Sequence, residues 1–187
     1  IFSMGWEAQW GGILINSAIV VYLVNLVLSM QKSKSNNVHA LFVLTAACWL
    51  LLTTLIGLLL VYNFSYAFLS MDSLHYLPLH ANIGIAGWFL LLVIGVGARL
   101  IPMFLISKYQ RPGLLWYIYL LINGGLLSFV FNFLYLRQPG FYLLPATAVG
   151  LSLILMAYYC YQSYRMRLRK KVDEQMKISL LAVAIMI

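Results

Sequence analysis

The sequence has 187 residues, of which 64% are hydrophobic and only 9% are charged. Its mean hydropathy of +0.93 and its shortage of charge exclude a water-soluble globular domain, in which about a quarter of the residues are charged. The net charge of +8 could suggest a nucleic-acid partner. The positions of the basic residues instead favour a role in membrane topology, and no nucleic-acid partner is predicted.

Five mostly apolar runs are long enough to cross a membrane as helices. A span needs about 20 such residues to cross a hydrocarbon core of about 30 Å. In chain order the runs cover about residues 11–30, 40–64, 77–106, 113–136 and 142–164. A sixth run begins near Ile178 and is too short to cross. We therefore predict an all-α fold, a polytopic transmembrane helical bundle in a lipid bilayer. It forms one domain over residues 1–187 and is expected to belong to a longer chain.

The basic residues predict the orientation of this bundle, because eleven of the 12 Lys and Arg residues lie in alternate connections. They are Lys32 and Lys34 after the first run, Arg99, Lys108 and Arg111 at the end of the third, and Arg165, Arg167, Arg169, Lys170, Lys171 and Lys177 after the fifth. By the positive-inside rule these connections are cytoplasmic and the amino terminus lies outside. We interpret the run from Arg165 to Lys171 as a topology anchor, with recognition of anionic lipid as the alternative.

The acidic residues are few and lie outside the apolar runs. They are Glu7, Asp72, Asp173 and Glu174. Proton-coupled transporters usually carry an ionisable residue near the middle of the membrane, so a transporter is the least favoured class. The sequence also lacks GxSxG, HExxH and GxxxxGK[ST] motifs, and no complete active site is predicted.

His80, in the third run, is the strongest candidate for a site. On a regular helix a stripe of mostly small residues would lie beside its imidazole, with Gly84, Gly87, Leu91 and Ala98 within about 40° and Gly95 within about 60°. Two interpretations stay open. The stripe could let a neighbouring helix pack closely. Alternatively, a haem could lie against it with His80 as its axial ligand, because neutral imidazole is a usual haem ligand and bundle interiors hold cofactors.

The other two histidines are weaker candidates. His75 would lie about 140° around the helix from His80, and we expect it to form hydrogen bonds at the membrane interface. His39 would lie about 30 Å away from His80, near the opposite face of the membrane. His39 and His80 therefore cannot share a metal ion.

Two further groups of residues are interpreted as packing residues. Gly124, Ser128 and Asn132 share one face of the fourth run, where Ser and Asn are expected to hydrogen-bond to neighbouring helices. Cys48 and Cys160 lie in different runs and lack CxxC spacing. We therefore predict neither a disulfide nor a metal site from them, and expect both to pack as small apolar residues.

The segment around His80 resembles a signature of haem-copper oxidase subunit I relatives. Its residues run from Leu79-His80-Ala81-Asn82-Ile83-Gly84-Ile85-Ala86-Gly87-Trp88 to Leu100-Ile101-Pro102-Met103-Phe104. They are similar to the His-x-Asn helix of C-type oxidases and nitric oxide reductases. They are also similar to the His-x-His-x-x-x-x-Gly-Trp helix of smaller bacterial membrane proteins related to them, although Asn82 stands where that helix has its second histidine.

The resemblance implies a haem-binding protein of the bacterial inner membrane that serves respiratory electron transfer or nitric oxide handling. His80 would be the metal ligand of haem b, with Gly84 and Gly87 beside the cofactor. A complete oxygen-reducing site needs more than the three histidines present, so the second axial ligand is expected from further helices of a longer chain or from another membrane subunit. The alternative is a non-catalytic scaffold subunit of a larger membrane complex, without its own cofactor.

Overall fold

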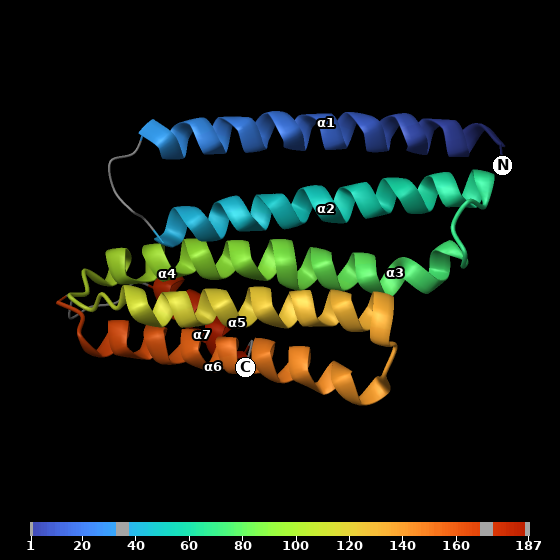
Figure 1. Cartoon of the computed structure of the whole chain (residues 1–187). Coiled ribbons are helices and arrows are strands. Elements are labelled where there is room, and N and C mark those ends of the chain that lie inside the picture. The colour runs from blue at the N-terminus through green and yellow to red at the C-terminus, as the bar shows by residue number, and fades with distance from the viewer. Residues whose placement is uncertain (1, 33–37, 169–173, 186–187) are drawn as a thin grey trace. The chain divides into compact units, whose positions relative to one another are not determined.

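The computed structural model describes residues 2–32, 38–168 and 174–185 and confirms the all-α, polytopic fold (Figure 1). Five helical segments are long and apolar enough to cross a membrane, namely Trp6–Lys32, Val38–Tyr66, Ser73–Leu105, Pro112–Leu136 and Pro139–Arg165. Each overlaps one predicted run. The orientation stays a prediction, and four of the basic residues on which it rests lie outside the described residues: Lys34, Arg169, Lys170 and Lys171.

The third and fourth spans are not regular α-helices from end to end. In chain order the elements are α1 (Phe2–Lys32), α2 (Val38–Tyr66), α3 (Ser73–Asn82), η1 (Ile83–Leu90), α4 (Leu91–Leu105), α5 (Pro112–Phe131), η2 (Asn132–Leu136), η3 (Pro139–Tyr142), α6 (Leu143–Arg165) and α7 (Glu174–Ile185). Both η1 and η2 are π-helical, and η3 is a 3₁₀-helix. α7 begins earlier than the predicted sixth run, because Glu174 in its first turn pairs with Lys177 at 2.7 Å and acidic groups stabilise a helix start.

The chain packs as two compact units. Unit 1 comprises Ile1–Asn36 and Leu44–Leu90, and unit 2 comprises Asn37–Val43 and Leu91–Ile187. Two of the borders between the units fall inside α2 and at the end of η1.

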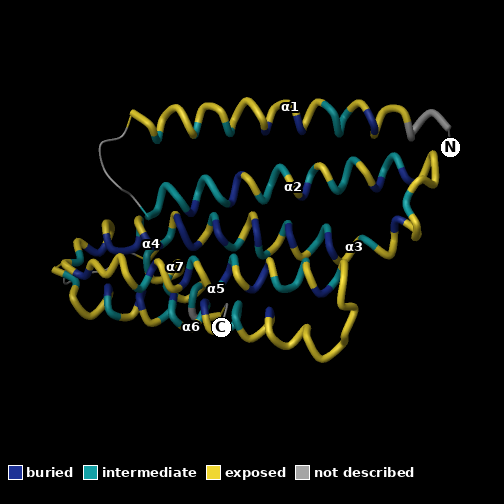
Figure 2. Tube along the Cα trace, in the orientation of Figure 1, coloured by how far each residue is buried: buried dark blue, intermediate teal, exposed yellow. Residues whose placement is uncertain are grey.

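In unit 1, α1 is exposed along most of its length, and only 6% of the residues in its most apolar stretch are buried (Figure 2). Exposed apolar side chains on a membrane span contact lipid. Polar side chains connect α1 to α2. Thr54 Oγ1 donates to Asn16 Oδ1 at 2.9 Å, and Gln9 Nε2 donates to Ser65 Oγ at 3.3 Å. Such bonds hold helices together in hydrocarbon, where apolar surface gives no driving force between them.

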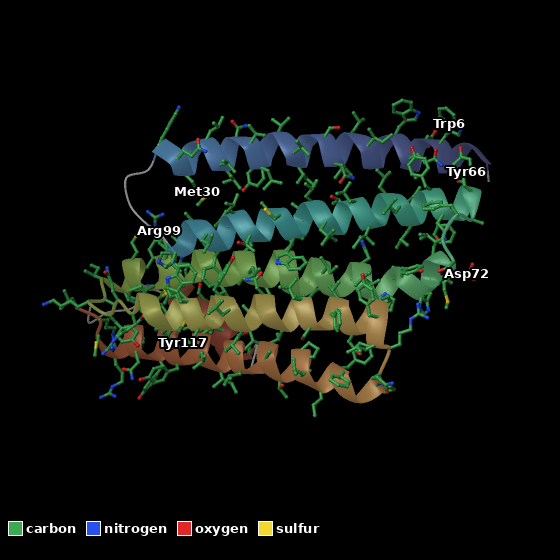
Figure 3. All side chains as sticks on the ribbon, viewed as in Figure 1. Trp6, Met30, Tyr66, Asp72, Arg99 and Tyr117 are labelled. Carbon is green, nitrogen blue, oxygen red and sulfur yellow. The ribbon has the colours of Figure 1, made fainter. Side chains whose placement is uncertain are left out.

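The ends of unit 1 carry the side chains expected at a membrane boundary. Trp6, Tyr66 and Asp72 lie at one end, and Met30 lies at the other (Figure 3). Tryptophan and tyrosine prefer the headgroup region, because one part of each ring is apolar and the other can form hydrogen bonds. The first two helices of the unit therefore end near the predicted positions.

In unit 2, α5 and α6 pack closely at Gly125. A Cβ atom added there would lie 3.2 Å from Ala148 Cβ and 3.3 Å from the carbonyl oxygen of Pro145. Ile118 and Ile122, on the same helix, are fully buried. A small residue thus allows the backbones to approach between larger buried side chains.

The prediction that the polar residues of the fourth span bind neighbouring helices is wrong. Nothing lies within 4 Å of a Cβ added at Gly124, and Ser128 Oγ donates to the carbonyl of Gly125 within its own helix at 2.8 Å. Asn132 is buried, but its side chain binds the connection that follows the span rather than another helix. Ser and Asn can satisfy their polar groups locally, so a shared face did not imply partners on other helices.

Buried asparagines hold the connections at the end of the second and fourth spans. Asn63 Oδ1 accepts a hydrogen bond from the Leu69 N–H at 2.8 Å, and its Nδ2 donates to Ser73 Oγ at 3.0 Å. Asn132 accepts from the Gln138 N–H at 3.2 Å and donates to the Gln138 carbonyl at 3.1 Å. In each case the side-chain amide of an asparagine bonds to backbone groups of the connection that follows the helix.

The two cysteines differ in their surroundings. Cys160 is buried in α6, as predicted, whereas Cys48 is exposed on α2. The packing role predicted for Cys48 is therefore wrong, because its side chain faces outward from the helix.

Candidate functional site

His80 lies near the end of α3, where the third span changes its helical geometry. Pro78 lies inside α3 and cannot donate a backbone hydrogen bond. The π-helix η1 begins three residues after His80, at Ile83. Such segments are rare and are found frequently at functional sites. The rotation of 100° per residue that predicts the glycine stripe does not hold across η1, because η1 is π-helical. The contacts of each glycine show which helix it faces.

The His80 imidazole is fixed by a backbone carbonyl on the neighbouring helix of unit 1. His80 Nδ1 lies 2.9 Å from the carbonyl oxygen of Thr53. A carbonyl oxygen can only accept, so this bond requires the proton on Nδ1. Neutral His80 then has its lone pair on Nε2. No described residue forms a hydrogen bond with that nitrogen.

Gly57 makes room for the imidazole on α2. A Cβ atom added at Gly57 would lie 3.0 Å from His80 Cε1 and 3.5 Å from His80 Nδ1. Any larger residue at position 57 would press against the ring. The ring is therefore positioned by two features of α2, an acceptor at Thr53 and the missing side chain one turn later.

The glycines of the predicted stripe face α2. A Cβ added at Gly84 would lie 3.1 Å from Thr53 Cγ2, and one added at Gly87 would lie 2.9 Å from Trp49 Cγ. These contacts match the helix-packing interpretation. Contact of Gly84 and Gly87 with haem stays a prediction, and it would require Thr53 and Trp49 to give way on this side of the span.

In unit 2 the stripe continues in the same manner at Gly95, where a Cβ atom would overlap Phe42. His39, on the same turn of α2 as Phe42, has its Nδ1 at 3.2 Å from the Gly95 carbonyl oxygen. His39 thus binds a backbone carbonyl through the same ring nitrogen as His80. An Nδ1 bond to a carbonyl therefore does not by itself distinguish a ligand from a packing residue.

His75 lies on the exposed surface of α3. Its ring contacts the Tyr76 ring edge-on, with centroids 5.4 Å apart. The backbone N–H of His75 donates to the Asp72 carbonyl at 2.9 Å. This position at the start of a span fits an interfacial residue. His75 and His80 are five positions apart on one helix, and the His80 ring lies against Thr53 and Gly57 of α2.

His80 fits as a single ligand to the iron of a haem. Metal-bound imidazole usually donates its other N–H to a carbonyl or carboxylate, which fixes the tautomer and the ring orientation. His80 has this arrangement. Among the described residues no three His, Cys, Asp or Glu side chains come together to hold a metal ion, so the histidine would act singly, as a haem ligand can.

Comparison with protein families, with characterised proteins and with solved structures finds no significant match to this chain. The resemblance of residues 79–104 therefore rests on the sequence alone. Thr53 and Gly57, which hold His80, were not assigned to it from the sequence.

Proposed function

We propose that this integral membrane protein binds haem b through His80 Nε2 and serves respiratory electron transfer or nitric oxide handling in the bacterial inner membrane. One observation carries the proposal. The Nδ1–H of His80 is bonded to the Thr53 carbonyl at 2.9 Å, and Nε2 has no bond to a described residue. The resemblance to haem-copper oxidase subunit I relatives supports the same nitrogen as the ligand.

The residues around His80 would orient the ligand and tune it. The Thr53 carbonyl accepts a hydrogen bond from the Nδ1–H, so in the neutral ring the lone pair available to a metal lies on Nε2. Gly57 leaves the space in which the ring stands, and α2 prevents the ring from turning. A bound haem would supply one-electron redox chemistry, with its potential influenced by His80 and by the His80 to Thr53 hydrogen bond.

A second function is favoured by the glycine contacts. Gly84 and Gly87 lie against Thr53 and Trp49, as expected for a helix pair held together by small residues. On this proposal the protein is a membrane scaffold subunit, and the His80 to Thr53 bond joins two of its helices. Its partners would be further membrane helices, from the same chain or from other subunits.

The two proposals differ in the visible absorption of the protein. Full-length protein purified in mild detergent and supplied with haem should show a Soret band that His80→Ala removes. His75→Ala is the matched control, because it deletes an imidazole from the same helix and should leave the band intact. A protein without a Soret band, or a band that survives His80→Ala, contradicts haem binding through His80.

The scaffold predicts a different outcome. His80→Ala would then lower the thermal stability of the protein, since a bond between helices is lost, but no spectral change would accompany it. Replacement by Asn, which can also donate to the Thr53 carbonyl, should restore stability without restoring a haem spectrum. The pair of variants thus separates a ligand from a residue that joins helices.

A further inference from the structure

The connection after α4 and the end of α6 meet at one end of unit 2 (Figure 1). Ser107 and Arg167 form an antiparallel bridge, and the Leu168 N–H donates to the Ile106 carbonyl at 3.3 Å. Ile106 has a positive φ of 49°, so the chain turns sharply where the bridge forms. We call residues 106–111 and 165–168 the basic turn.

The Arg167 guanidinium is held in place but is not fully bonded. Its Nη1 donates to the Tyr164 carbonyl at 2.9 Å, and its Cζ lies 3.8 Å from the centre of the Tyr164 ring. Arg167 Nε is buried and has no hydrogen-bond partner among the described residues. Unpaired buried donors are uncommon in folded proteins. Because Nε is enclosed by the protein, an external anion would reach the guanidinium through its Nη groups.

The basic turn holds three cations besides Arg167, and none of them forms an ion pair with a described carboxylate. Lys108, Arg111 and Arg165 belong to the same turn and are exposed. The sequence contains no Asp or Glu between Asp72 and Asp173. Among the described residues the ion pair formed is that of Lys177 with Glu174, outside the turn. The basic turn therefore concentrates positive charge for which the described residues supply no ion-pair partner.

Large apolar side chains alternate with these cations. Ile106, Met166 and Leu168 are 58%, 51% and 57% exposed. Such exposure in water would be unfavourable, but it is expected where a protein surface meets acyl chains. Tyr164, which is also exposed, adds a ring of the kind that prefers the headgroup region.

We infer that the basic turn binds an anionic phospholipid, with Arg167 at the phosphate and Ile106, Met166 and Leu168 against the acyl chains. An arginine offers several N–H groups in a fork that matches phosphate oxygens. The exposed cations of Lys108, Arg111 and Arg165 meet the headgroup first. The shared chemistry is that of a phosphate anion, and the apolar neighbours assign it to a lipid rather than to free phosphate.

The test compares lipid binding by purified full-length protein in detergent. Phosphatidylglycerol is added, with phosphatidylcholine and inorganic phosphate as separate arms, and bound lipid is measured by native mass spectrometry together with the thermal unfolding midpoint. Phosphatidylglycerol should be retained and should raise the midpoint, whereas the other two should not. Arg167→Gln should weaken retention about ten-fold, since hydrogen bonds to charged groups are among the strong ones.

Arg137→Gln is the matched control, because it removes the same charge at the opposite end of the fourth span and should retain lipid normally. If Arg167→Gln does not fold, the double variant Lys108→Gln with Arg111→Gln keeps the Ser107 to Arg167 bridge and should still lose lipid. Equal loss in Arg137→Gln and Arg167→Gln would reduce the effect to net charge and overturn the inference. Equal response to inorganic phosphate, or to phosphatidylcholine, would overturn it as well.

Discussion

A single methyl group at Gly87 should loosen the contact between α2 and η1. A Cβ atom built there lies 2.9 Å from Trp49 Cγ, 3.0 Å from Trp49 Cβ and 3.1 Å from Trp49 Cδ2. Cβ contacts below 3.0 Å are essentially never found, and the indole ring near its attachment point cannot bend away. The helices must separate or Trp49 must leave its position.

The magnitude follows from two opposing effects. Adding a methylene to a well-packed contact destabilises the folded protein by about 1–3 kcal/mol. Replacing a helical glycine by alanine stabilises the helix by roughly 1 kcal/mol. Gly87→Ala should therefore lower the free energy of unfolding by about 0–2 kcal/mol. Gly124→Ala is the matched control, because nothing lies within 4 Å of its Cβ, and it should gain roughly 1 kcal/mol.

The assay is thermal unfolding in detergent, followed by circular dichroism. For a protein of this size 1 kcal/mol corresponds to about 2–4 °C in Tm, so Gly124→Ala should unfold above Gly87→Ala by a measurable margin. Adding Trp49→Leu should rescue Gly87→Ala, since the smaller side chain relieves the overlap, and a double-mutant cycle measures that coupling. The close contact is refuted if both alanine variants are stabilised alike, or if Trp49→Leu gives no rescue.

Three further predictions concern single side chains. Gly57→Ala should push the His80 ring by its 3.0 Å contact and shift the Soret maximum of the haem-loaded protein, and an unchanged spectrum together with unchanged stability would contradict the contact. Asn132→Ala leaves the backbone groups of Gln138 without partners and should cost about 1–3 kcal/mol, with faster hydrogen exchange confined to the connection after the fourth span. Burial raises the pKa of Tyr109, which lies between the third and fourth spans, above its ordinary value of 10.0. The folded protein therefore holds that proton more tightly than the unfolded chain, and its stability should fall as pH rises above about 10. Tyr109→Phe should remove that part of the alkaline loss in a pH series of unfolding curves, and an identical alkaline loss in both proteins would contradict it.

The spans were predictable because their signal is large and local. About 20 apolar residues in succession are needed in hydrocarbon, and charges at the ends set the limits. The observed helices extend past most predicted limits, as α1 does at Lys32, because a helix can continue into the headgroup region on residues that are not apolar. The π-helices were not predictable, since no residue type in Ile83–Leu90 requires that geometry.

The environment of His80 was only partly predictable, for a reason that lies in the backbone. Its partner is the carbonyl of Thr53, and a main-chain acceptor is present whatever the side chain, so the sequence does not indicate it. The close approach of the two helices, however, is visible in the sequence as small residues. Gly57 with His80, and Thr53 with Gly84, share one midpoint in the sequence, between Phe68 and Leu69 in the connection from α2 to α3, as two antiparallel helices joined by a short connection require. Small residues at such paired positions therefore predict where two spans approach closely. They do not predict whether the imidazole between them also carries a metal, because helix packing and haem ligation both need the same ring orientation, and the choice depends on what approaches Nε2.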